Sequence, residues 1–394
     1  MAGDRLPKGI YFRSGQTAPD FFRLATFNFE PTAAPETARA AIETIWDVIA
    51  DLKRGIVRDL NATKPEDPTI RIEPGDLEAT LCYGRRLFDP TGRQTPLVAE
   101  LKRPWHLPPL RTYDGPFRSL RWGPTAEPEA AQTDFAIMLN GATELSVARA
   151  LVEIQKAIDD HALPLRIVCF FAGLHRDDRR SWIDFHDGIN NMEASQRQIA
   201  IEITQGPDWL LGGATMAFLK IAIDLQGWRK LPREIQEALV GRDKLSGCPI
   251  ADIDVDVQGK VTLRHVPGCP MKREIGLDTP ELIELRQSPI EPIVKTSHIH
   301  RANQSRTPPD MTDTPNRIFR QGYEFVDSPP GGGLRIGLNF VSFQRHIERV
   351  TDILDTDGWL GDVNFGGIPG ERTVPAFPLM SVVAGGLFVV PPVD

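Results

Sequence analysis

FFRLATFNF at residues 21–29 is the stretch that decides the fold, because a segment of different periodicity follows it directly. Its aromatic and apolar side chains predict a β-strand. In the next segment apolar residues recur at steps of three and four, which predicts a helix that starts with Thr37 as its N-cap and stops at Gly55. LEATLCY at residues 77–83 predicts a second strand. The chain is therefore expected to open with a strand–helix–strand unit.

The same order of elements recurs further along the chain. DFAIML at residues 134–139 and LRIVCFF at residues 165–171 predict strands, and apolar positions from Val147 to Ile158 predict the helix between them. A further strand is predicted over 213–225 and a helix over 231–240. Strands over 334–343 and 385–390, with a helix start near Gln344, close the chain. Helices connected to antiparallel or mixed strands favour an α+β fold over a doubly wound sheet.

Composition limits the class of protein. The chain has 394 residues, 41% of them apolar and 25% charged, which is typical of a globular protein and excludes wholesale disorder. Its net charge of −8 argues against general nucleic-acid binding, which needs a basic surface. No segment approaches the roughly 18 apolar residues of a membrane-spanning helix, and no signal-peptide core precedes the first strand, so we expect a cytoplasmic protein without a membrane partner.

The sequence motifs of several common enzyme classes are absent. There is no G-x-x-x-x-G-K-[ST] loop, no G-x-S-x-G elbow and no H-E-x-x-H helix. No two of the four cysteines have C-x-x-C spacing, so zinc-ribbon and thioredoxin-like sites are excluded and reduced, buried thiols are expected. Two polar stretches, 242–275 and 285–333, predict long loops that serve a function or are ordered by a ligand.

One candidate segment is DFHDGINNM at residues 184–192. An Asp-Gly pair after an aromatic residue normally predicts only a turn, and for Asp187 and Gly188 alone that is the favoured interpretation. In the functional alternative, the glycine lets the backbone approach a flat ligand closely while the carboxylate points into a pocket.

Two further segments carry residues suited to binding a cofactor. SHIHRANQ at residues 297–304 contains His298 and His300, and histidine is a frequent metal ligand and the usual proximal ligand in several haem proteins. NRIFRQG at residues 316–322 contains Arg317 and Arg320, and a guanidinium can stabilise a developing negative charge or bind a propionate. Taken singly, each segment is better explained as a polar surface loop or a solvated pair on a turn.

Taken together and in order, these segments resemble the dye-decolorizing peroxidases. The family motifs correspond to Phe185-His186-Asp187-Gly188, His298-Ile299-His300-Arg301-Ala302-Asn303, Arg317-Ile318-Phe319-Arg320-Gln321-Gly322, Leu338-Asn339-Phe340 leading to Gln344, and Gly385-Gly386-Leu387-Phe388 with Pro391-Pro392. The likeness extends from about residue 20 to the end of the chain. The resemblance rests on the shared order of the five motifs and not on any single one of them.

The resemblance implies two ferredoxin-like subdomains with antiparallel sheets, similar to a dimeric α/β-barrel, that enclose a haem pocket. We expect an N-terminal arm over 1–20, an N-terminal ferredoxin-like half over 21–171, and a C-terminal half with the haem site over 172–394. The implied cofactor is haem b, iron protoporphyrin IX, with His298 as the iron ligand. Glu348, Asp352 and Asp355 are candidates to receive the other ring N–H of this histidine.

The resemblance also implies the chemistry. Asp187 and Arg320 are expected on the distal side, where hydrogen peroxide binds: the carboxylate as general acid–base, the guanidinium as a stabiliser of negative charge. Residues expected to line the cofactor are Gly188, Ile189, Arg320, Leu338 and Phe340. The implied enzyme is a peroxidase that oxidises aromatic and phenolic compounds, dyes included, through an oxoferryl intermediate. Its partners would be hydrogen peroxide and a small aromatic reductant, and homo-oligomerisation is left open.

Departures from the family pattern keep alternatives open. Met192, His300 and Gln304 stand where the family commonly has other residues. His300 is therefore an alternative iron ligand, and a haem-binding or haem-handling protein with little peroxidase turnover is an alternative function. A third hypothesis is a haem-free ferredoxin-like scaffold that binds partners. The segment 84–132 has no assignment.

Overall fold

The computed structural model describes residues 6–7, 9–10, 18–62, 64, 66, 68–88, 133–188, 194–258, 260–265, 297–302, 318–354 and 379–393. Of the residues singled out in the sequence, Ile189, Met192, Gln304, Arg317 and Asp355 lie outside this set, as do the side chains of His300 and Asp352.

The first part of the chain forms a βαββαβ unit. Its elements are β1 (Phe21–Phe29), α1 (Pro35–Lys53), α2 (Arg58–Asn61), β2 (Glu78–Gly84), α3 (Arg85–Phe88), β3 (Phe135–Gly141), α4 (Glu144–Asp160) and β4 (Leu165–Leu174). The strands are antiparallel and lie in the order β4-β1-β3-β2. A βαββαβ unit with this strand order is a ferredoxin-like subdomain, as expected from the sequence.

The later part repeats this arrangement with longer insertions. Its elements are α5 (Ala194–Ile201), a 3₁₀ turn (Asp208–Leu210), β5 (Ala214–Ile223), α6 (Leu225–Lys230), α7 (Arg233–Val240), β6 (Ile250–Val255), β7 (Val261–His265), α9 (His298–Arg301), β8 (Phe319–Asp327), β9 (Arg335–Gln344), α10 (Glu348–Leu354) and β10 (Met380–Val390). Strands β10-β5-β9-β8 are antiparallel neighbours, which is the same ferredoxin-like order.

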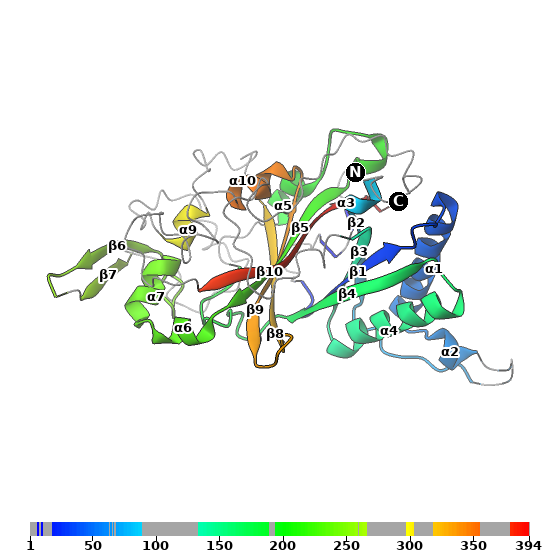
Figure 1. The fold of residues 1–394 in the computed structure, drawn as a ribbon, viewed down its shortest axis with the longest axis horizontal. Helices are drawn as coiled ribbons and strands as arrows, with labels where there is room; N and C mark the ends of the chain where they lie inside the picture. Colours follow the sequence, from blue (N-terminus) through cyan, green and yellow to red (C-terminus); the bar gives the residue numbers. More distant parts are fainter. Residues whose placement is uncertain are drawn as a thin grey trace.

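The two sheets join edge to edge into a closed barrel. Strand β10 pairs with β2, and β4 pairs with β8, so the order β1-β3-β2-β10-β5-β9-β8-β4 returns to β1. In Figure 1, α1 and α4 lie together beside β1 and β4, while α6, α7 and the β6–β7 hairpin lie at the opposite end of the molecule. The predicted α+β class with antiparallel sheets is confirmed.

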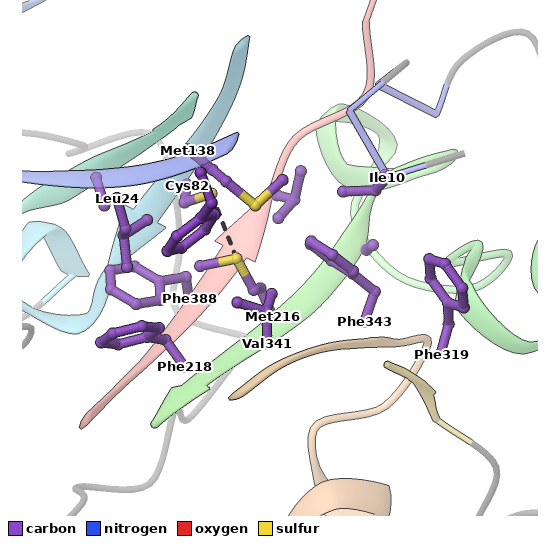
Figure 2. Close-up of a cluster of buried hydrophobic side chains, with 14 of the residues drawn as sticks. Ile10, Leu24, Cys82, Met138, Met216, Phe218, Phe319, Val341, Phe343 and Phe388 are labelled. Atoms are coloured by element: carbon purple, nitrogen blue, oxygen red, sulfur yellow. Dashed lines mark hydrogen bonds between the residues drawn. The ribbon is translucent and has the colours of Figure 1, made fainter. Parts of the chain in front are cut away.

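Side chains from alternate strand positions fill the barrel. Figure 2 shows this core, in which the thiol of Cys82 approaches the sulfur of Met216 at 3.8 Å. The labelled residues come from strands of both subdomains and from the N-terminal segment: Ile10, Leu24, Cys82, Met138, Met216, Phe218, Phe319, Val341, Phe343 and Phe388. This shared core holds the two sheets together, because burial of apolar surface is the main favourable term in folding.

Helices α1 and α4 cover the outer face of the first sheet through the apolar positions that the sequence indicated, including Ile45, Ile49 and Ile154. The predicted cap is wrong in detail. Ala34 is the N-cap of α1 and Pro35 follows it, whereas the hydroxyl of Thr37 donates to the Ala34 carbonyl at 2.9 Å. The proline accounts for the earlier start, because its fixed φ suits the first turn of a helix.

Other differences concern the loops and the cysteines. The stretches predicted as loops contain the β6–β7 hairpin, α9 and β8. The strands among them were missed because their polar side chains hide the alternation typical of a strand. Gln344 still belongs to β9, and α10 begins at Glu348. Cys248 is disulfide-bonded, which corrects the expectation of reduced thiols, whereas Cys82 and Cys169 keep their thiols and form no disulfide. Sequence spacing could not show this bond, because it depends on which segments meet in space. No described helix is long and apolar enough to cross a membrane.

Candidate active site

The candidate site lies on the outer face of the β8–β9 pair. Side chains alternate between the two faces of a strand, so Arg320, Gly322 and Glu324 share one face of β8. Their partners on β9 are Ser342, Phe340 and Leu338. The intervening residues Phe319, Tyr323 and Val341 point into the barrel core. The sheet therefore presents Arg320, Leu338 and Phe340 together, as the sequence motifs had suggested.

Asp187 approaches this face from the loop that follows β4. Its backbone N–H donates to the Arg179 carbonyl at 3.0 Å, and its Oδ1 accepts the N–H of Gly188 at 2.7 Å. Gly188 has φ of 73°, a left-handed conformation that favours glycine. The other oxygen, Oδ2, lies 2.7 Å from the place where a Cβ on Gly322 would be. The Asp-Gly pair thus forms a turn, and the same turn brings the carboxylate to β8.

Charged residues of the same loop hold it in place. Arg176 pairs with Asp178 at 2.6 Å, and Arg179 pairs with Asp20 at 2.9 Å. Arg180 donates to the carbonyls of Asp184 and Lys244 at 2.7 and 2.6 Å. Through these contacts the three arginines fix the backbone that carries Asp187.

His298 is the first residue of α9, which contacts α7. The preceding Ser297 is fully buried. Gly241 ends α7 with φ of 91°, and a Cβ there would lie 2.6 Å from Ser297 Oγ and 2.7 Å from Ile299 Cγ1. Glycine suits position 241 because the backbone has a positive φ and because a side chain would collide with Ser297 and Ile299. The close packing of Gly241 against these residues places the start of α9 beside the end of α7.

Electrostatic interactions connect His298 to the sheet. Burial, followed by repulsion from Arg320 and Arg242, lowers the pKa of His298 to about 4. Burial also lowers the pKa of Arg320, and the negative charge of Asp187 opposes this shift. Burial, followed by repulsion from Arg320, lowers the pKa of Arg242 to about 10. His298 is therefore a neutral imidazole near pH 7, with a ring nitrogen in the form that binds a metal ion.

Arg242, His298 and Arg320 are largely withdrawn from solvent but are not fully buried. Burial is the largest cause of the pKa shifts of Arg242, His298 and Arg320, yet each keeps solvent-accessible surface. Leu338 and Phe340 are likewise only half-buried, in contrast to their inward-facing neighbours. A neutral imidazole, apolar walls and two guanidiniums fit an iron porphyrin with anionic propionates. The structure thus brings the predicted Asp187, His298, Arg320, Leu338 and Phe340 into one region.

Two residues of this region were not predicted from the sequence. Arg242 lies at the end of α7, in a stretch interpreted as a polar loop. Glu324 is 4% exposed, and burial and the charge of Asp187 raise its pKa to about 8. Its position two residues after Gly322 would have indicated it once β8 was recognised as a strand. Glu348, a candidate partner of the histidine, is exposed at the start of α10.

Comparison with known proteins places the chain in a family. The family model described as "Dyp-type peroxidase, C-terminal" matches residues 178–394. The deferrochelatase of Escherichia coli K12 is 24% identical over 174 residues, which cover 42% of this chain and 35% of that protein. The chain thus aligns with about a third of the length of this curated relative, and Shigella flexneri has a deferrochelatase that matches equally.

Solved structures show the same fold. A DyP-type peroxidase from Cellulomonas bogoriensis superposes with a TM-score of 0.64 and 20% identity, covering 99% of this chain and 95% of its own. Ferric DtpA from Streptomyces lividans gives a TM-score of 0.66 and 18% identity, covering 99% and 94%. At these identities the likeness establishes the fold alone. The family model, however, matches more than half of the 394 residues, so this chain belongs to the Dyp-type peroxidase family.

Proposed function

We propose that this protein is a haem peroxidase that uses hydrogen peroxide to oxidise small aromatic or phenolic compounds, dyes included. The observation that carries the proposal is the grouping of Asp187, His298 and Arg320 in one region at the outer face of β8 and β9, where Arg320 interacts electrostatically with both other side chains. Family membership supports the reaction class, since the family is one of haem peroxidases.

The residues present suit haem b, and each has a distinct role in holding it. A ring nitrogen of His298 would bind the iron, while Leu338, Phe340 and Gly188 would lie against the porphyrin. Arg242 would neutralise a propionate, because a guanidinium can bind a carboxylate through two hydrogen bonds. Bound haem iron supplies the electrons that break the O–O bond of peroxide.

The protein's own task is to move a proton and balance charge. Breaking the O–O bond requires that a proton move from one peroxide oxygen to the other. The carboxylate of Asp187 would accept this proton and return it, as a general acid–base. Arg320 would hold positive charge near the oxygen that becomes negative and near the ionised Asp187, whose charge already acts on it.

Haem handling with little peroxidase turnover is the second candidate. It is favoured by the name deferrochelatase, which the matched relatives carry, and by the sequence departures at Met192, His300 and Gln304. Under this hypothesis His298 would bind haem in the same region, but Asp187 and Arg320 would not accelerate the reaction with peroxide.

Reconstitution with hemin tests haem binding. The full chain should give a Soret band, and His298→Ala should lose it, whereas the exposed His161→Ala should keep it. An unchanged Soret band and hemin affinity in His298→Ala would remove this histidine as the ligand. His300→Ala is the matched variant for the neighbouring alternative.

Stopped-flow mixing of the reconstituted protein with hydrogen peroxide distinguishes the two functions. A peroxidase should show a rapid absorbance change and oxidise an added phenol. Asp187→Asn and Arg320→Leu should keep the haem but slow this change about 100-fold or more. If the wild-type protein reacts slowly and both variants match it, the haem-handling hypothesis is supported instead. The cytoplasmic location stays a prediction, as do the two half boundaries and the oligomeric state.

A further inference from the structure

Glu324 is a buried acid that the mechanism above does not use. Its side chain leaves the same face of β8 as Arg320 and Gly322, and the residue is 4% exposed. One oxygen, Oε2, accepts the backbone N–H of Trp182 at 3.1 Å. The other, Oε1, is buried and has no hydrogen-bond partner among the described residues. A buried carboxyl oxygen of this kind is costly unless it carries or receives a proton.

Two structural features bring the loop that carries Asp187 close to β8 and Glu324. Trp182 anchors the loop to β8 twice, since its ring N–H also donates to the Phe325 carbonyl at 3.0 Å. Gly322, two residues before Glu324 on β8, has no side chain, and a Cβ there would lie only 2.7 Å from Asp187 Oδ2. The loop that presents Asp187 is thus hydrogen-bonded directly to Glu324.

The charged groups around Glu324 favour its neutral form. Burial is the largest cause that raises its pKa to about 8, and the negative charge of Asp187 is the second. The N–H of Trp182 and the positive charge of Arg176 act in the opposite direction and are outweighed. Its strand neighbours, Leu174 on β4 and Leu338 on β9, are apolar.

We propose that Glu324 is a second acid of this site, a positioning residue that keeps one proton beside Asp187 and exchanges it with that carboxylate. The inference rests on the proposed peroxidase function. In the exchange, the O–H bond of Glu324 breaks and an O–H bond forms on Asp187, while the negative charge passes from Asp187 to Glu324. The pair keeps one proton and one negative charge throughout, as two nearby carboxyl groups do when both cannot ionise.

The proton on Glu324 can be observed without haem. Infrared spectra of the full chain, recorded in H₂O and D₂O across a pH titration, show the C=O band of a protonated carboxyl, which deuteration shifts. We expect a band at neutral pH that disappears near the pKa of Glu324, about 8. Glu324→Gln should lack this band, because its amide still accepts from Trp182 but carries no acidic proton.

Asp184→Asn is the matched control, since it removes one carboxylate from the same loop, is 59% exposed in its side chain and pairs with Arg176 and Lys244. It should keep the band. Glu324→Asp, which restores an acid, should keep a band as well and covers the case in which the amide variant folds poorly. Equal bands at neutral pH in the wild-type protein and a folded Glu324→Gln variant would overturn the proposal.

The exchange with Asp187 is tested in the hemin-loaded protein. The rate of reaction with peroxide should fall about tenfold per pH unit above the pKa of Glu324, because a second negative charge makes Asp187 return its proton more slowly. Glu324→Gln should lose this alkaline limb, and Asp184→Asn should keep it. The same limb in Glu324→Gln would show that Glu324 does not act through Asp187. If the infrared band is found in the haem-free protein but neither the wild type nor any variant reacts with peroxide, the proposed peroxidase function is wrong, whereas the proton on Glu324 is confirmed.

Discussion

Gly322 lies directly beneath the carboxylate of Asp187: a Cβ atom on the glycine would be 2.7 Å from Oδ2 of the aspartate. The same Cβ would be 3.1 Å from Cδ1 of Leu338. A heavy-atom contact of 2.7 Å to a carbon is shorter than van der Waals contact, so the carboxylate occupies this position only because residue 322 has no side chain. The missing side chain at position 322 of β8 thus leaves the room that the carboxylate of Asp187 needs.

Gly322→Ala should displace Asp187 and leave the fold intact. The atom that must move is the end of a side chain, so we expect a loss of stability of no more than about 1 kcal/mol. The rate of reaction with peroxide should fall at least about tenfold, because a general acid–base must lie within hydrogen-bond reach of its proton. Chemical denaturation and stopped-flow spectra of the hemin-loaded protein measure the two effects.

Gly337→Ala on the adjacent strand is the contrasting variant. There the added Cβ would lie 1.9 Å from the backbone carbonyl oxygen of Ile221, which cannot move without disturbing the β5–β9 pairing. It should cost more than about 2 kcal/mol of stability. The prediction fails if Gly322→Ala destabilises the protein as much as Gly337→Ala does, or if it leaves the rate of reaction with peroxide unchanged. Room for the Asp187 carboxylate would then not be the reason for a glycine at position 322.

The sequence predicts the strands of the core better than the strand that carries the site. The limits of β1 agree with the predicted 21–29 because its residues are apolar and aromatic over nearly its whole length. In β8, by contrast, Arg320 and Glu324 face the site, and Gln321 faces inward, where it donates to the Gly9 carbonyl at 3.3 Å. Polar residues on both faces remove the alternation on which strand prediction depends.

For the site, the ordered motifs predicted Asp187, His298 and Arg320, and the structure brings these three together. Arg242 and Glu324 carry no motif, so only the folded chain identifies them. Their importance arises from burial and from charges far away in the sequence, and neither can be obtained from local spacing. Functional positions that break a local rule are expected where a structure serves a site.

Glu324 should make stability depend on pH. Its pKa in the folded state is about 8, against 4.5 as the ordinary value, so the folded protein keeps a proton that the unfolded chain releases. The stabilisation is complete below about pH 4.5 and is lost as pH rises towards 8, after which it no longer changes. Glu324→Gln lacks this dependence. The free energy of unfolding of the wild type, relative to the variant, should therefore fall by on the order of 3 kcal/mol between about pH 5 and about pH 9.

Urea titrations of both proteins at several pH values measure this difference. Asp184→Asn is again the control, and its stability relative to the wild type should vary little over the same range, because the side chain is exposed. A constant difference between the wild type and Glu324→Gln would show that Glu324 has an ordinary pKa in the folded protein.

Lys220, Asp327 and Arg335 form a partly buried group of charges, and removing different members should have unequal effects on stability. Lys220 is 9% exposed, forms an ion pair with Asp327 and lies over the ring of Phe325 at 4.4 Å. Arg335 also pairs with Asp327, at 2.7 and 2.9 Å. Lys220→Met keeps the arginine pair and should cost less than about 1 kcal/mol, whereas Asp327→Asn leaves two cations together and should cost about 3 kcal/mol.

Thermal and urea unfolding of the two variants test this order. The double variant Lys220→Met with Asp327→Asn should recover part of the loss of the single Asp327→Asn variant, since one of the two unpaired cations is gone. Equal losses in both single variants would mean that Arg335 does not compensate for the missing lysine.

Arg242 should contribute to haem affinity rather than to the reaction with peroxide. Arg242 and Arg320 both act on His298 as positive charges, while Asp187 is the acidic group that acts on Arg320. Among these described residues, the positive charges therefore outnumber the negative ones. The two propionates of haem would balance this charge. We expect Arg242→Leu to weaken hemin binding about tenfold to 100-fold and Arg242→Lys to weaken it less, because lysine keeps the charge but not the planar, two-point contact. Arg264→Leu on the exposed end of β7, with 73% of its side chain exposed, should bind hemin as the wild type does.

Hemin titrations followed at the Soret band give the affinities of these variants. Melting temperatures show separately how much stability is lost with the hydrogen bond that Arg242 donates to the Gly247 carbonyl at 2.8 Å. If Arg242→Leu melts lower but binds hemin unchanged, the arginine serves the α7–β6 connection and not the cofactor.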